Sequence, residues 1–216
     1  MDYQIVATVE EGTNYCNAFY NPASENIFFG NSQTCGNLAL MSDVIYHEYT
    51  HGVVDHVYSQ GLLDTREGRA MHEGYSDYFA ATINNNSCMS EGFNSQSCLR
   101  STDNTLGYED LKNSEIHTFG LVFSGAIWDL RQKVGQELAD ALTIKAMQLE
   151  PVTMKNFLAS MLIVDDNNTN LGDGTPNSED ICESFSDNHG IASAYCGDKG
   201  IIPMNSGTPF YTINEN

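Results

Sequence analysis

The spacing of apolar residues along the chain changes near residue 38. Residues 3–9 and 15–29 are rich in Tyr, Phe, Ile and Val and are interrupted by turn-forming residues, which predicts strands with a turn at residues 21–22. From Leu38 onward, apolar residues recur at near-helical spacing, and Gly61 is a suitable stop. This pattern predicts one long helix between these two positions.

The rest of the chain alternates helical patterns with polar loops. The predicted helices cover residues 69–83, 118–134, 136–149, 153–164 and 178–187, and the stretches 84–98, 99–116 and 165–176 are predicted to be loop or irregular. An α+β fold follows, with a small strand-bearing N-terminal lobe and a mainly helical C-terminal lobe. We expect one domain, 1–216, made of a strand-rich part (about 1–37), a helical part (about 38–190) and a C-terminal extension (191–216).

The chain is strongly acidic. It carries 9 Lys and Arg against 29 Asp and Glu, a formal charge of −20, which repels nucleic acid phosphates and anionic membrane surfaces. It has no run of about eighteen apolar residues that would span a membrane. Neither nucleic acid nor a membrane is therefore an expected partner, and we expect a monomer. The acidic excess suits a solvated surface in salty water or carboxylates gathered around calcium, and the two are compatible.

Six cysteines lie in three sequence-local pairs. This usage is typical of an oxidised, extracellular protein, and buried thiols of a cytosolic protein are the alternative. Because the first ten residues lack a secretion signal, an exported protein would have lost its signal and any pro-segment. Six cysteines allow fifteen pairings. The nearest-neighbour pairing that we expect is Cys16 with Cys35, Cys88 with Cys98, and Cys182 with Cys196.

The predicted helix after residue 38 contains the sequence His-Glu-Tyr-Thr-His. His47 and His51 are four residues apart, so their imidazoles stand on one face of the helix and can bind one ion. Glu48 then lies beside the metal, where it can take a proton from bound water. A zinc hydrolase that keeps an open coordination position needs a third protein ligand. We therefore expect one catalytic Zn²⁺ ion and a further ligand elsewhere in the chain.

The third ligand is either another His or a carboxylate. A His six residues after His51 is excluded because that position is Val57. The nearest carboxylate candidate is Glu73, on the second predicted helix. Asp77 lies four residues further on, where it can accept the free ring N–H of a ligating His and fix its orientation, and His72 is a further supporting residue. An ordinary surface acid is the alternative role for Asp77.

These residues carry a resemblance to a known family. HEYTHGVVDH followed by EGYSD resembles the thermolysin- and fungalysin-like zinc metalloendopeptidases, the gluzincins, which have HExxH and then a Glu ligand in an E-x-x-S-D frame. The segments Asn17–Tyr20, Leu99–Arg100, Glu115–His117 and 165–191 agree as well, so the likeness covers roughly residues 15–190. It implies a zincin-like fold with the active-site cleft between the two lobes, here in a minimal or trimmed version.

The resemblance also implies how a protein or peptide substrate would bind. Asn17 and Ala18 would hold substrate backbone as an added strand, Arg100 would bind a substrate carbonyl, and His117 would stabilise the oxyanion. The pocket just past the scissile bond would be lined by Leu38, Val44 and Leu99 and would favour bulky apolar side chains. The alternatives are a turn former for Asn17, a surface salt bridge for Arg100, a helix-entry residue for His117, and core packing for the three apolar residues.

Two positions depart from the family pattern. Asp64 stands where the family has a Tyr that assists the oxyanion, and an ionised acid cannot donate that hydrogen bond. The role of the Tyr is therefore unassigned. Lys112 stands where the family has an Asp that steadies the catalytic His, and Glu115 and Asp110 are both candidates to replace it.

A polar loop near the C-terminus offers oxygen ligands that suit calcium. Its spacing does not match the helix-loop-helix calcium motif, so a solvated loop is the alternative. The candidate calcium ligands are Asp165, Asp166, Asn168, Asn170 and Asp173.

The predicted function is that of a secreted zinc metalloendopeptidase that hydrolyses internal peptide bonds, with Glu48 activating the water. An aminopeptidase-type zinc peptidase is one alternative, although the chain has no Gly-x-Met-Glu-Asn segment to grip a free amine. A non-catalytic secreted binding module that retains a zinc site is another. Structural zinc sites, however, usually have four ligands, most of them Cys.

Overall fold

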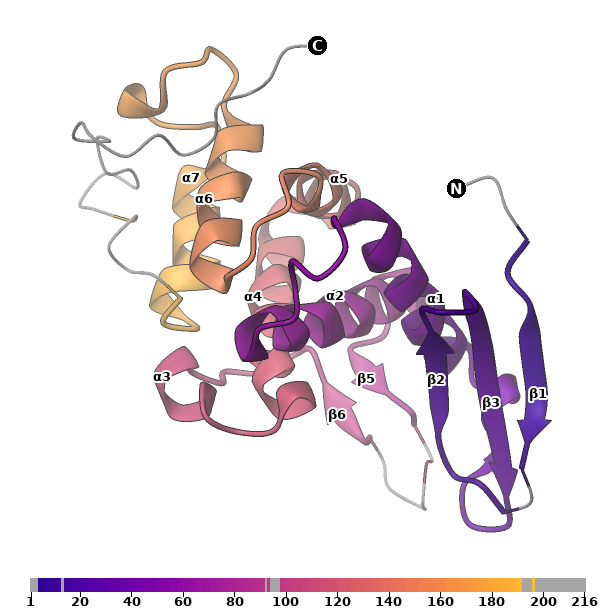
Figure 1. Ribbon diagram of the computed structural model, residues 1–216. Coiled ribbons are helices and arrows are strands. Elements are labelled where there is room, and N and C mark those ends of the chain that lie inside the picture. The colour runs from indigo at the N-terminus through magenta and orange to yellow at the C-terminus, as the bar shows by residue number, and fades with distance from the viewer. Residues whose placement is uncertain (1–3, 13, 92, 94–97, 192–195, 197–216) are drawn as a thin grey trace.

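The computed structural model describes residues 4–12, 14–91, 93, 98–191 and 196 (Figure 1). The strands are β1 (Ala7–Glu11), β2 (Ala18–Asn21), β3 (Asn26–Ser32), β4 (Gly36–Asn37), β5 (Cys88–Met89) and β6 (Arg100–Ser101). The α-helices are α1 (Ser42–Val57), α2 (Arg66–Asn84), α3 (Tyr108–Leu111), α4 (Ile116–Val134), α5 (Gln136–Met147), α6 (Met154–Asp165) and α7 (Ser178–Cys182). 3₁₀ turns lie at Leu38–Leu40 and Leu171–Asp173, and a π-helical turn at Glu183–Asp187 follows α7.

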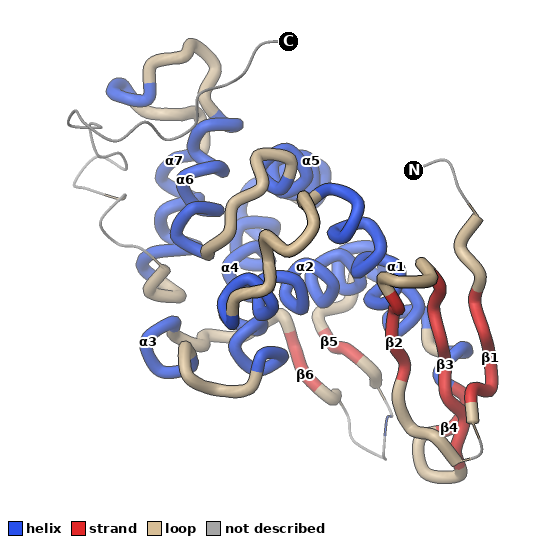
Figure 2. Tube along the Cα trace, viewed as in Figure 1, coloured by secondary structure: helices blue, strands red, loops and turns tan. Residues whose placement is uncertain are grey.

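The N-terminal strands form a small mixed sheet along one side of the molecule, and helices make up most of the rest (Figure 2). Strand β3 is central, since it runs parallel to β1 and antiparallel to β2 and β4. Strand β2 is therefore an edge strand. The turn between β2 and β3 is closed by Asn21, whose Oδ1 accepts hydrogen bonds from the backbone N–H groups of Ala23 and Ser24. The turn predicted at residues 21–22 is confirmed.

Helix α1 begins later than the apolar pattern predicts. Leu38 lies in a 3₁₀ turn, because the Asn37 side chain caps that turn at the Ala39 N–H and Met41 has an extended backbone. The helix then starts at Ser42 and ends at Val57. Gly61, with a φ of 82°, lies in the following loop and does not cap the helix itself.

Two glycines bring α2 and α4 into close contact. A Cβ on Gly74 would lie 2.7 Å from the Gly120 carbonyl oxygen, and a Cβ on Gly120 would lie 2.7 Å from the Ala70 carbonyl oxygen. Gly120 also sits against the Cβ of Glu73. Since no larger residue fits this contact, the glycine pair holds the start of α4 beside the middle of α2.

An aromatic cluster forms the centre of the helical part. Tyr75 of α2 packs edge-on against Phe123 of α4, with ring centroids 4.8 Å apart, and Phe123 packs in the same way on Phe157 of α6 at 4.7 Å. All three side chains are fully buried. Such ring pairs stabilise a core beyond the area that they bury. They fix the relative positions of the helices that carry the polar residues described below.

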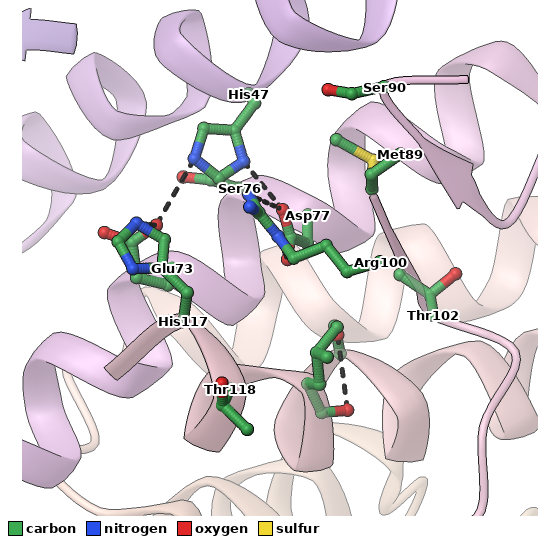
Figure 3. A network of polar contacts seen from close by, with 12 residues as sticks. His47, Glu73, Ser76, Asp77, Met89, Ser90, Arg100, Thr102, His117 and Thr118 are labelled. Carbon is green, nitrogen blue, oxygen red and sulfur yellow. Dashed lines mark hydrogen bonds and ion pairs between the residues drawn. The ribbon is translucent and has the colours of Figure 1, made fainter. Parts of the chain in front are cut away.

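Two short elements lie in stretches that the sequence predicts as loop or irregular. Strands β5 and β6 form a two-stranded antiparallel ribbon, and α3 is a single helical turn. Elements of two to four residues are too short to show a periodic pattern. The ribbon places Met89 beside Arg100 at the edge of the helical part (Figure 3).

The three expected disulfide bonds are all present. They join Cys16 to Cys35, Cys88 to Cys98 and Cys182 to Cys196. The predicted C-terminal extension, 191–216, lies outside the described residues apart from Ile191 and Cys196. Within the described part of the chain, no helix combines the length and apolar character needed to span a bilayer.

Candidate active site

Helix α1 carries three buried polar side chains on one face. His47, Glu48 and His51 are only 5%, 6% and 8% exposed. One turn separates the two imidazoles, and their Nε2 atoms lie 3.1 Å apart. Burial lowers the pKa of His51. A low pKa favours the neutral imidazole, which is the form that ligates a metal.

Glu73 on α2 completes a group with these two rings. Its Oε2 atom lies 3.3 Å from His47 Nε2 and 3.7 Å from His51 Nε2. This buried oxygen has no hydrogen bond of good geometry among the described residues. Within the described chain, these three residues form the only set of His, Cys, Asp or Glu side chains whose ligand atoms converge, with all of them inside 4.8 Å.

The geometry of this group fits a single zinc ion. Atoms bound at 2.0–2.1 Å to a tetrahedral centre are about 3.3 Å apart, and the observed separations are 3.1, 3.3 and 3.7 Å. Two imidazoles and one carboxylate are donors that zinc accepts, and three protein ligands leave a fourth position open. A cation between them would also account for the buried oxygen of Glu73.

Helix α2 fixes the far side of both imidazoles. The Nδ1 atom of His47 lies 2.8 Å from Asp77 Oδ1 (Figure 3), and the Nδ1 atom of His51 lies 3.1 Å from Ser76 Oγ. Ser76 donates its own proton to the His72 carbonyl oxygen, so its oxygen is left to accept from His51. Both rings therefore carry their proton on Nδ1 and turn Nε2 toward Glu73. The contact of Asp77 with a histidine is the one that the sequence predicts.

Arg100 does not form a surface salt bridge, because its partner Asp77 is fully buried. Its Nε and Nη2 atoms each donate a hydrogen bond of 2.8 Å to the Asp77 carboxylate. Although burial alone would raise the pKa of Asp77, Arg100 and His47 hold it well below its usual range. The Asp77 carboxylate thus stays ionised between a guanidinium and an imidazole. Among the described residues, two of the five N–H groups of Arg100 donate these hydrogen bonds.

Glu48 lies beside the histidine pair and faces strand β2. Burial raises the pKa of its carboxyl, while His47 opposes the shift. The backbone N–H of Tyr20 in β2 also donates a hydrogen bond to this carboxyl. A carboxylate with a raised pKa is a better proton acceptor near neutral pH than an ordinary one.

His117 stands at the start of α4, opposite α1. Its Nε2 atom lies 3.4 Å from Glu73 Oε2, and its Nδ1 atom lies 2.6 Å from Glu115 Oε1. Glu115 is also the N-cap of α4, since its Oε2 accepts hydrogen bonds from the backbone N–H groups of His117 and Thr118. Of the two acids considered for His117, the structure brings Glu115 to it, while Lys112 pairs with Glu109.

One cavity of about 490 Å³ is lined by His47, Glu48, His51, Glu73, Arg100 and His117. The residues expected to contact substrate also line it, namely Asn17, Ala18, Arg100, Leu38, Val44 and Leu99. Leu38 also belongs to an apolar cluster with Ile27 and Phe29. It therefore both packs in the core and lines the cavity. Leu99, at 40% exposed, is the most open of the three apolar residues.

Known proteins are similar to parts of this chain. A family model described as the catalytic domain of thermolysin metallopeptidase matches residues 1–55. An extracellular metalloprotease of Pectobacterium carotovorum subsp. carotovorum is 30% identical over 79 residues, which cover 37% of this chain and 22% of that protein. Bacillolysin of Bacillus caldolyticus is 37% identical over 79 residues, or 37% of this chain and 14% of that protein.

The chain is therefore similar to thermolysin metallopeptidases over part of its length. The matched stretches span less than a quarter of the length of these curated relatives. The solved precursor of protealysin, a metalloproteinase from Serratia proteamaculans, superposes with a TM-score of 0.73 at 16% identity. The match covers 87% of this chain and 69% of that one, and at this identity it shows a shared fold.

The site has two supporting residues for which the sequence predicts no specific contact. Ser76 belongs to the E-x-x-S-D frame, but only the packed structure shows that it serves His51. His72 was expected only as general support. Its ring lies 4.7 Å from that of His51 and it lines the cavity. Asp64 is exposed and does not line the cavity, so the Tyr role stays unassigned.

The predicted calcium loop uses its polar atoms on itself. Asp165 is buried and accepts hydrogen bonds from the Thr175 hydroxyl and from the backbone and side-chain N–H groups of Asn177. Asn168 donates to Asp173 Oδ2, and Asp166 and Asn168 accept from the backbone at Asn168 and Asn170. Calcium binding by this loop stays a prediction.

Proposed function

We propose that this chain is a secreted zinc-dependent endopeptidase that cleaves internal bonds of proteins or peptides. His47, His51 and Glu73 would hold one zinc ion. The ion, when bound, would supply Lewis acidity to a water molecule and to the substrate carbonyl. The observation that carries the proposal is the convergence of two Nε2 atoms on Glu73 Oε2, a buried oxygen that accepts no hydrogen bond among the described residues.

Glu48 is the proposed proton carrier. Because burial raises the pKa of its carboxyl, Glu48 can accept a proton from the attacking water and later deliver it to the leaving amine. Tyr20 supports this role, since its backbone hydrogen bond holds the Glu48 carboxyl against β2. The proton would thus pass from the water to Glu48 and from Glu48 to the leaving amine within the cavity.

His117 is the proposed donor to the oxyanion. Glu115 binds Nδ1 of His117, so the ring presents Nε2 on the side of Glu73 and the cavity. A donor that is already oriented in this way does not have to be reorganised during the reaction. Arg100, held by Asp77, keeps N–H groups for a neighbouring substrate carbonyl.

Strand β2 is the proposed binding edge for substrate backbone. It is the last strand of its sheet, and Asn17, Ala18 and Tyr20 line the cavity. An extended peptide added at such an edge is read through its main chain, which favours cleavage inside a chain. Leu38, Val44 and Leu99 would then receive a bulky apolar side chain just past the cleaved bond.

Three disulfide bonds support an oxidising, extracellular setting for this enzyme. A removed pro-segment and a monomeric state are further parts of the proposal.

Metal analysis and a cleavage-product survey test this function together. We expect one zinc per chain, loss of activity with a chelator, and recovery with added zinc. On a denatured casein-like substrate, the products should come from internal bonds. Release of single N-terminal residues would instead favour an aminopeptidase, and zinc binding without any hydrolysis would favour a binding module.

A further inference from the structure

The cavity extends along α1 to both sides of the proposed metal ligands. Val44, His47, Glu48, His51 and Asp55 all line it. Val44, His47, His51 and Asp55 follow one another at intervals of three or four residues, and Glu48 lies four residues after Val44, so all five occupy one side of the helix. Val44 and Asp55 are eleven residues apart, which corresponds to about 16 Å along the helix axis. The two histidines lie between them, near the middle of the cavity.

The two ends of the cavity differ in chemistry. At one end, Val44 belongs to an apolar cluster with Leu38 and Phe93, which also line the cavity. At the other end, Asp55 has polar neighbours, since the Tyr20 hydroxyl donates a hydrogen bond to it and His72 is close enough to interact with its charge. The cavity thus has an apolar end and an acidic end on opposite sides of the metal ligands.

Asp55 is fixed in place and still accessible. The Tyr20 hydroxyl donates a hydrogen bond of 3.3 Å to Asp55 Oδ2. The Tyr20 ring packs on Gly52 of α1, where a Cβ would lie 3.1 Å from the ring. Asp55 itself is exposed at the mouth of the cavity. A carboxylate can accept about four hydrogen bonds, so the one from Tyr20 leaves room for a cationic partner.

We propose that Asp55 determines specificity by binding a Lys or Arg side chain of the substrate, an inference that rests on the endopeptidase function proposed above. From the midpoint of the two histidines to Asp55 the helix advances about 9 Å. An extended peptide covers this length in two to three residues. The basic residue therefore lies two or three positions from the cleaved bond, on the side away from the bulky apolar residue. The net charge of −20 attracts such cationic substrates as well.

Matched peptides test this specificity on the full, zinc-loaded chain. Each peptide keeps one Leu beside the cleaved bond and carries Lys, norleucine or Glu two or three positions away on the other side. We expect kcat/KM for the Lys peptide to exceed that for norleucine by about fivefold, the upper range for an exposed ion pair. The preference should shrink at high salt. Asp55→Asn should remove it, and Asp55→Lys should transfer it to the Glu peptide.

Asp64→Asn is the matched control. It makes the same change in net charge, at an exposed residue that does not line the cavity, and should keep the Lys preference. Equal rates for Lys and norleucine in the wild type, or an unchanged preference in Asp55→Asn, would overturn the proposal.

Binding of the same peptides with a reduced, uncleavable bond separates this inference from the proposed function. If no peptide is hydrolysed but the Lys form binds the wild type about fivefold more tightly than it binds Asp55→Asn, the function fails and the basic-side-chain site stands. If hydrolysis occurs without any dependence on Lys or Asp55, the function stands and the site fails.

Discussion

Asp77 lies 2.8 Å from His47 through its Oδ1 atom, and the same carboxylate takes two hydrogen bonds from Arg100. One buried acid therefore orients a proposed metal ligand on one side and a proposed substrate-binding residue on the other. Because Asp77 is fully buried, no solvent can replace it in either contact.

Replacement of Asp77 should weaken metal binding. In Asp77→Asn the amide cannot accept the two Arg100 bonds and orient His47 at once, so we expect zinc affinity to fall about 10–100-fold. Competition with a chromophoric chelator measures this. Asp140→Asn is the control, since Asp140 accepts hydrogen bonds from Tyr78 and Thr82 of α2 away from the cavity. It should lower stability and leave zinc affinity unchanged, and equal losses in both variants would count against the assigned role.

Glu115 should act on the reaction only through His117. We expect His117→Ala to lower kcat about 10²–10³-fold, the loss typical of one oxyanion donor. Glu115→Gln should lower kcat about tenfold, because the ring loses its charged partner at Nδ1. In the double variant the two losses should not multiply. A Glu115→Gln effect that persists in full without His117 would show that Glu115 works by another route.

Raising the pH above about 10 should destabilise the protein through its buried tyrosines. Burial and Asp140 raise the pKa of Tyr78, and burial also raises the pKa of Tyr75. A tyrosine whose folded pKa is raised contributes stability below its unfolded pKa of about 10 and loses it as the pH rises further. Each such group contributes at most about 1.4 kcal/mol per pH unit.

Denaturant unfolding at pH 9 to 11 would measure this slope. Tyr78→Phe should make the slope shallower, even though the variant loses its bond to Asp140 and is less stable overall. Tyr49→Phe, at a side chain 44% exposed, should keep the wild-type slope. Equal slopes for the wild type and Tyr78→Phe would contradict the buried state of this hydroxyl.

The Cys88–Cys98 disulfide should support substrate binding as well as stability. It ties together the β5–β6 ribbon, whose Met89, Leu99 and Arg100 line the cavity. Replacing both cysteines with Ser should cost about 2–4 kcal/mol of unfolding free energy and raise KM more than it lowers kcat. The Cys182–Cys196 pair lies outside the cavity lining, so its Ser variant should lose stability with KM unchanged.

The sequence predicted the closeness of the two imidazoles because their geometry is local. His47 and His51 share a helix, and their four-residue spacing alone puts the rings together. The proposed ligand Glu73 and the contact of Asp77 followed from a second helix and a family motif. The contacts of Ser76 and the choice of Glu115 over Asp110 depend on how α2 and α4 pack, which rests on the Gly74 and Gly120 contact.

The boundaries of elements were predicted less well. Side-chain capping by Asn37 moves the start of α1 to Ser42, and no periodic pattern reveals a cap of that kind. The β5–β6 ribbon is held by a disulfide and two residue pairs, so it leaves no trace in the alternation of apolar residues.

Zinc content and hydrolysis in two variants test the central claim most directly. Glu48→Gln should keep one zinc per chain and lose hydrolysis at least about 10²-fold, because Glu48 is proposed to carry the proton and not to bind the metal. Glu73→Ala should lose both. Glu109→Gln, at an exposed acid outside the cavity, is the control and should change neither. Full hydrolysis by Glu48→Gln, or a retained zinc ion in Glu73→Ala, would contradict the account.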